Sequence, residues 1–97
     1  MFAPREFEWD EAKEARNFAK HGFLFTDILG VFSDPARVDY DVSWPAEGEF
    51  RRKTVGRIDG RFFAVVYTLR GTGYRLISAR KANAPERRRY GHRPIPP

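Results

Sequence analysis

Residues 50–80 read FRRKTVGRIDGRFFAVVYTLRGTGYRLISAR, and this stretch decides the fold. Asp59–Gly60 inside it is a strong signal for a two-residue hairpin turn, because Asp and Gly tolerate the positive φ that such turns need. Residues 61–69 follow directly and are almost continuously apolar, so we expect a central strand covered on both faces. A half-exposed strand pattern also lies upstream of this stretch, at residues 38–42. The chain therefore has four segments with strand patterns: residues 38–42, 50–58, 61–69 and 74–80.

Three helices are predicted around these strands. Asp10 caps the first, which runs to His21. A short second helix ends at the Asp34–Pro35 step, and Asn83 caps a third with Glu86 three residues later. Four apolar residues fall on one face of the first helix at helical spacing: Ala12, Ala15, Phe18 and Ala19. The small Ala residues among them predict close approach to a sheet or to another helix. Two helices, four strands and one helix predict an α+β fold, with helices packed against a four-stranded antiparallel sheet.

Composition and charge narrow the class of protein. The chain has 97 residues and no Cys, so we expect one domain over residues 1–90, without disulfides or Cys-bound metals, and a flexible Pro-rich tail over 91–97. Neither a signal peptide nor a membrane span is visible, which predicts a cytoplasmic protein with no membrane partner. The net charge is −6 over residues 1–49 and +11 over residues 50–97. A basic half of this kind attracts nucleic acid.

Basic side chains on the strands are the first candidates for function. Arg51 and Arg80 are candidate catalytic residues, because a guanidinium binds two phosphate oxygens at once. Strict alternation along a strand directs Arg51 and Arg52 to opposite faces, and likewise Arg75 and Arg80. Seven residues are candidates for RNA binding: Arg52, Lys53, Arg57, Arg61, Arg70, Arg75 and Tyr90. The alternative for each single Arg is a solvated surface position.

Proton transfer could involve three further side chains. His21 is the usual type of residue for this chemistry near neutral pH, and Lys20 stands beside it. Both could instead serve the C-terminus of the first helix. Glu49 could act as a base, hold an Arg or be exposed to solvent. No motif for a metal, a phosphate loop or a nucleophilic Ser is present, so we expect no cofactor.

A partner surface is predicted on apolar residues outside the strands. The short second helix offers Ile28, Leu29 and Phe32, and Trp44 stands in a polar loop beside Pro45. Trp44 either packs onto the core or anchors a partner protein.

The pattern as a whole resembles the BrnT family of type II toxins, within the wider RelE/ParE-like group, over Phe7 to Tyr90. Several spaced segments carry the resemblance: Phe7-Glu8-Trp9-Asp10 with Lys13 and Asn17, Lys20-His21-Gly22, Phe32 with Asp34-Pro35, Glu49 with Arg51, Gly56, Val65-Val66-Tyr67-Thr68 with Arg70, and Ile77-Ser78-Ala79-Arg80 with Ala82, Glu86, Arg87 and Tyr90. One departure is Arg52, where the family often has an aromatic residue.

The resemblance implies a ribonuclease toxin with a RelE-like sheet. It also implies a cognate antitoxin, BrnA, whose ribbon-helix-helix part binds operator DNA, in a complex of two toxins and two antitoxins. We expect metal-independent RNA cleavage by 2′-hydroxyl attack that arrests growth, with charge stabilised by Arg51 and Arg80 and protons handled by Lys20, His21 or Glu49. The alternative function is a non-catalytic inhibitor that binds RNA, the ribosome or DNA gyrase.

Overall fold

The computed structural model describes residues 6–43 and 50–91. Eight elements follow one another along the chain: β1 (Phe7–Glu8), α1 (Glu11–His21), the 3₁₀ helix η1 (Phe25–Ser33), β2 (Val38–Asp41), β3 (Arg52–Ile58), β4 (Arg61–Arg70), β5 (Gly73–Lys81) and α2 (Ala84–Gly91). The predicted α+β class and all three helical segments are confirmed, although the second helix is made of 3₁₀ turns. Glu49 and Trp44 lie outside the described residues.

The sheet has five strands rather than the predicted four. Their order is β1-β5-β4-β3-β2, and every pairing is antiparallel except that of β1 with β5, which is parallel. β1 is only two residues long, so no alternating pattern marks it. Gly73 permits it to approach, because a Cβ there would lie 2.9 Å from the carbonyl oxygen of Glu6. The prediction of a purely antiparallel sheet was therefore wrong.

Local signals account for the turns and the helix ends. Asp59 and Gly60 both have positive φ, of 49° and 80°, and form the predicted hairpin turn between β3 and β4. The Asp10 carboxylate accepts hydrogen bonds from the backbone of the first turn of α1. Asn83 and Glu86 exchange side chain to backbone hydrogen bonds of 2.9 Å in each direction, which is the predicted capping box of α2.

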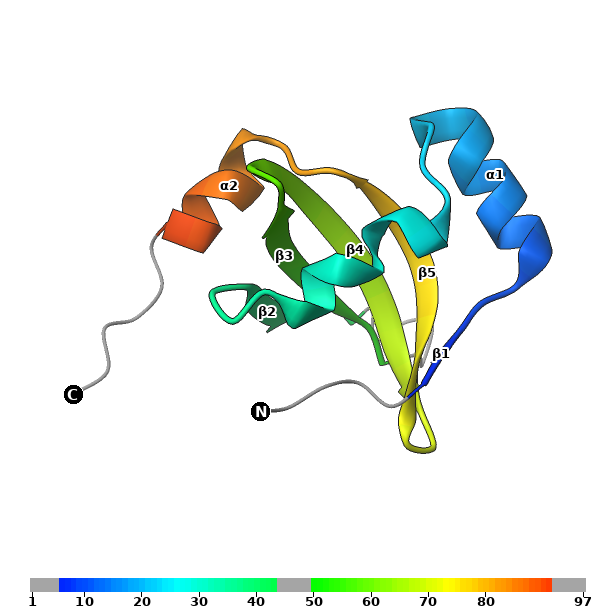
Figure 1. Cartoon of the computed structure of the whole chain (residues 1–97). Coiled ribbons are helices and arrows are strands. Elements are labelled where there is room, and N and C mark those ends of the chain that lie inside the picture. The colour runs from blue at the N-terminus through cyan, green and yellow to red at the C-terminus, as the bar shows by residue number, and fades with distance from the viewer. Residues whose placement is uncertain (1–5, 44–49, 92–97) are drawn as a thin grey trace.

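Helices cover the two faces of the sheet unequally (Figure 1). η1 crosses one face, here called the η1 face, and packs on β3 and β5. Side chains of that face form the main core: Phe25, Ile28, Val31, Phe32, Phe63, Val65, Tyr67, Leu76 and Ala79. The opposite face holds a smaller cluster of Val55, Ala64 and Ala82, against which Tyr90 of α2 packs.

A β-bulge at Ile77 changes which side chains share a face. Tyr67 pairs with Leu76, but its neighbour Val66 pairs with Ser78, so Ile77 is the extra residue of β5. Arg75 and Arg80 consequently lie on the same face, opposite to η1. The prediction from strict alternation placed them on different faces and was wrong.

Candidate functional site

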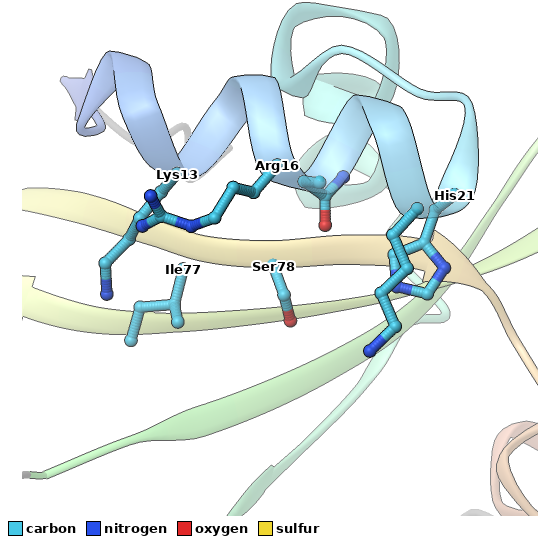
Figure 2. A pocket seen from close by; sticks show the side chains of 7 residues that line it. Lys13, Arg16, His21, Ile77 and Ser78 are labelled. Atoms are coloured by element: carbon cyan, nitrogen blue, oxygen red, sulfur yellow. The ribbon is translucent and has the colours of Figure 1, made fainter.

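An open groove of about 370 Å³ runs between α1 and β5. Figure 2 shows Lys13, Arg16 and His21 reaching from α1 past β5, with Ile77 and Ser78 next to them. The remaining lining residues are Asn17 and Lys20. Lys20 and His21, both predicted as catalytic, therefore lie in one groove, and no acidic residue lines it within the described part of the chain.

Asn17 fixes the position of α1 against the edge of β5. Its side-chain amide donates to the carbonyl oxygen of Ala79 at 2.8 Å and accepts from the Ala79 backbone amide at 3.0 Å. It also donates to the carbonyl oxygen of Phe23 at 3.3 Å. Asn17 is only 7% exposed, and it satisfies the edge of β5 beyond the short β1. The predicted packing face of α1 was wrong, because Phe18 is 50% exposed and the three Ala residues of that face are exposed too.

The environment of His21 favours its neutral form. Burial lowers the pKa of the imidazole below 6.5, and the positive charges of Lys20 and Arg80 lower it further. Arg80 thus acts electrostatically on His21 although it comes from the end of β5. A neutral imidazole at pH 7 can accept a proton, which is what a general base requires.

Arg80 is not a free cation, because it forms a bidentate ion pair with Glu86. Its two terminal nitrogens donate to the two Glu86 oxygens at 2.7 and 2.8 Å, and Lys53 Nζ donates at 2.7 Å. Burial raises the pKa of Glu86, but Arg80, Lys53 and the Asn83 amide outweigh that effect and lower the pKa to about 2. Glu86 is 4% exposed, so this carboxylate fixes α2 to β5 and β3. Arg80 therefore has a structural role as well as any catalytic one.

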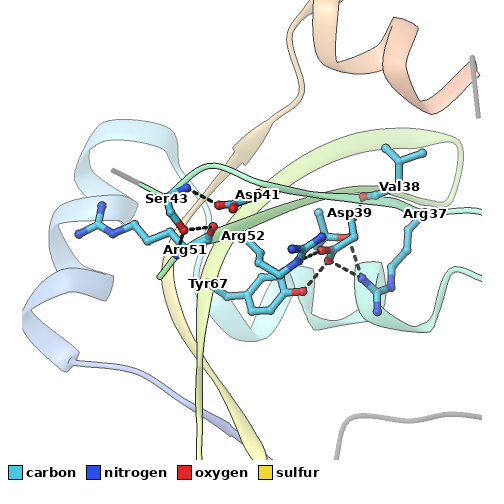
Figure 3. A network of polar contacts seen from close by, with 9 residues as sticks. Arg37, Val38, Asp39, Asp41, Ser43, Arg51, Arg52 and Tyr67 are labelled. Atoms are coloured by element: carbon cyan, nitrogen blue, oxygen red, sulfur yellow. Dashed lines mark hydrogen bonds and ion pairs between the residues drawn. The ribbon is translucent and has the colours of Figure 1, made fainter. Parts of the chain in front are cut away.

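Arg52 faces away from the groove. It pairs with Asp39 on the η1 face, where Arg37 and the hydroxyl of Tyr67 also donate to the same carboxylate (Figure 3). Burial and the bond to Asp39 raise the pKa of Tyr67. Its partners make Arg52 a link between β2, β3 and β4. Arg51 points the opposite way, as alternation predicts.

The other predicted RNA-binding residues are dispersed. Arg75 pairs with Glu8 at 2.6 Å, and Arg70 approaches the same carboxylate at 3.7 Å. Arg57 and Arg61 are exposed near the β3–β4 turn and lie over aromatic rings. Tyr90 packs its ring on Phe62 and donates to Asp34 at 3.0 Å, so it stabilises α2. Lys53, held by Glu86, shares the face opposite to η1 with Arg80 and Arg75.

Most of the chain is similar in sequence to a known protein family. Residues 9–86 match the family described as "Ribonuclease toxin, BrnT, of type II toxin-antitoxin system". The chain belongs to the BrnT toxin family. The matched range includes α1 and β5, which build the groove, and Glu86, which fixes α2 to the sheet. A comparison with curated proteins gave no significant match.

A BrnT toxin has an antitoxin partner, and the structure revises where one could bind. Ile28 and Phe32, predicted to contact the partner, are 1% and 3% exposed and belong to the core. Their apolar stripe faces the sheet, which explains the pattern without a partner. Leu29 packs partly against the same core. The exposed large apolar residues of the described chain are Phe18, Leu24, Phe50 and Leu69.

Lys13, Arg16 and Asn17 are missing from the sites predicted by sequence, although they define the groove. Their spacing contained the signal, because residues 13, 16, 17 and 20 recur at helical intervals on one face. Asn17 on that face supplies the buried contact, and the cations flank it. Within the described residues no group of three or more His, Asp or Glu could hold a metal ion, and no helix could span a membrane.

Proposed function

We propose that this BrnT-family chain is an endoribonuclease whose reaction takes place at the His21 end of the groove. The observation that carries the proposal is an imidazole next to cations in an open groove that no described acid lines, an environment that lowers the pKa of His21. Phosphodiester cleavage needs this combination, because a base must accept a proton while positive charge stabilises the transition state.

In the proposed reaction the 2′-oxygen of a ribose attacks the adjacent phosphorus. His21 accepts the 2′-hydroxyl proton, and the Lys20 ammonium donates a proton to the departing 5′-oxygen. The new bond joins the 2′-oxygen to phosphorus, and the bond from phosphorus to the 5′-oxygen breaks. The products are a 2′,3′-cyclic phosphate and a 5′-hydroxyl. Arg80 adds positive charge nearby, while Arg51 lies further along the sheet and is assigned to binding the substrate strand.

Incubation of the purified chain with RNA tests this mechanism. Cleavage should persist in EDTA and leave 2′,3′-cyclic phosphate ends. His21→Gln should reduce kcat/KM by about 10²- to 10⁴-fold, and His92→Gln, which changes the second His of the chain, should not. Intact RNA combined with growth arrest would favour the non-catalytic inhibitor, and loss of all cleavage in EDTA would contradict the proposed chemistry.

We infer further that the antitoxin partner is BrnA-like, binds operator DNA through a ribbon-helix-helix part and forms a cytoplasmic complex of two toxins and two antitoxins. The basic half of the chain supports this, because it offers a surface complementary to an acidic antitoxin segment. Co-expression with the adjacent open reading frame should relieve growth arrest and give a complex of that mass on size-exclusion chromatography with light scattering. A toxin that remains monomeric and toxic would contradict the partner assignment.

A further inference from the structure

We propose that the α1 side of the groove is a phosphate-binding track for single-stranded RNA, in which Lys13, Arg16 and Lys20 bind successive backbone phosphates. The inference rests on the proposed function for the identity of the nucleic acid, and it places the strand along α1 rather than across the sheet.

The row of three cations is long enough to cover a short run of phosphates in a nucleic-acid backbone. They lie three and four residues apart on one helix face, which is about 4.5 and 6 Å along the axis. The track is therefore about 10 Å long. A stacked strand carries one phosphate about every 3.4 Å, so about three phosphates fall within this length.

The three cations of α1 have no acidic partners among the described residues, in contrast to several cations of the sheet. Arg80 and Lys53 share Glu86, and Arg75 pairs with Glu8. By contrast, within the described residues no ion pair involves Lys13, Arg16 or Lys20.

Asp10, at the start of α1, is an acid that Arg16 influences electrostatically. Its carboxylate is occupied as the cap of α1, where it accepts from the Ala12 and Lys13 amides. Like charges at positions 16 and 20 disfavour the helix slightly. An external polyanion would compensate them.

The floor of the groove is better suited to the phosphate backbone of RNA than to a nucleic-acid base. Ile77 lies at the bulge and Ser78 beside it, and no described Phe, Tyr or Trp lines the groove to stack on a base. The imidazole of His21, at the end of α1, is the one ring among the described lining residues. The two hydrogen bonds between Asn17 and Ala79 fix the spacing between α1 and β5. The track is therefore preorganised for phosphates and tolerant of base sequence.

Binding of a short 2′-O-methyl RNA strand, followed by fluorescence anisotropy across a salt series, tests the track without cleavage. Each phosphate contact on a single strand contributes about 0.7 to the slope of log K against log salt. The double variant Lys13→Gln/Arg16→Gln should therefore lower that slope by about 1.4 and weaken binding about 25-fold near 0.1 M salt. Arg16→Gln alone should lower the slope by about 0.7.

The matched control is Lys81→Gln/Arg88→Gln, which removes the same charge from exposed positions outside the groove. An unchanged slope in the control supports the track, whereas an equal loss in both double variants would show a general charge effect and overturn it. If the wild-type protein does not bind the RNA but binds polyglutamate through Lys13 and Arg16, the groove is a site for a protein partner. That result would also overturn the proposed phosphate track. Binding with the expected slopes but no cleavage of unmodified RNA would refute the ribonuclease proposal and leave the track standing.

Discussion

The ion pairs of Glu86 give the most quantitative prediction, through the variant Glu86→Gln. Gln keeps the size of the side chain and can still accept from the Asn83 amide, but it removes the charge that Arg80 and Lys53 bind. The pKa of Glu86 falls from 4.5 to about 2 on folding, because the bonds from these cations outweigh burial. At about 1.4 kcal/mol for each pH unit, this difference is about 3 kcal/mol of stability at pH 7.

The sign of the effect gives a characteristic pH dependence. A carboxyl whose pKa is lowered on folding stabilises the protein above its unfolded pKa, and the contribution is lost as pH falls toward the folded pKa. Urea unfolding should show wild type about 3 kcal/mol more stable than Glu86→Gln at pH 7, and about 1–1.5 kcal/mol more stable at pH 3. Glu11→Gln, at an exposed carboxylate, should change stability by less than about 0.5 kcal/mol. An equal gap between wild type and Glu86→Gln at both pH values would refute the electrostatic reasoning.

Three further variants test the parts that position the groove. Asn17→Asp replaces a donor with an acceptor opposite two carbonyl oxygens, so urea unfolding should show a loss of about 2–4 kcal/mol, and a loss under about 1 kcal/mol would contradict the anchoring role. Lys20→Gln removes a charge that lowers the pKa of His21, so NMR titration of the imidazole should give a higher pKa than in wild type; an unchanged or lower value would count against the site electrostatics. Gly73→Ala places a Cβ 2.9 Å from the Glu6 carbonyl oxygen, so β1 should detach and the Tyr74 amide, which donates to that oxygen, should exchange faster with deuterium; unchanged protection would contradict the steric argument.

Features that depend on neighbouring residues were predictable. The Asp59–Gly60 turn, the Asp10 cap and the Asn83–Glu86 capping box all follow from the intrinsic conformations and short-range hydrogen bonds of these residues. The same reasoning found Lys20 and His21 at the end of α1. It could not show that Glu86 would neutralise Arg80, because the two residues meet only when α2 folds back against β5.

Sequence alone determined the three helical segments, four of the five strands, the turn that aligns β3 with β4 and the concentration of positive charge in the second half of the chain, because these depend on local conformation and composition. The tertiary structure decided on which face of the sheet each side chain lies. The bulge at Ile77 put Arg75 and Arg80 on one side, and Asn17 placed the cations of α1 beside the edge of β5. One extra residue in a strand reverses the direction of every side chain that follows it, and an edge is satisfied by whichever polar group reaches it in space. Both effects arise from contacts between segments far apart in the sequence, so the groove exists only in the folded chain.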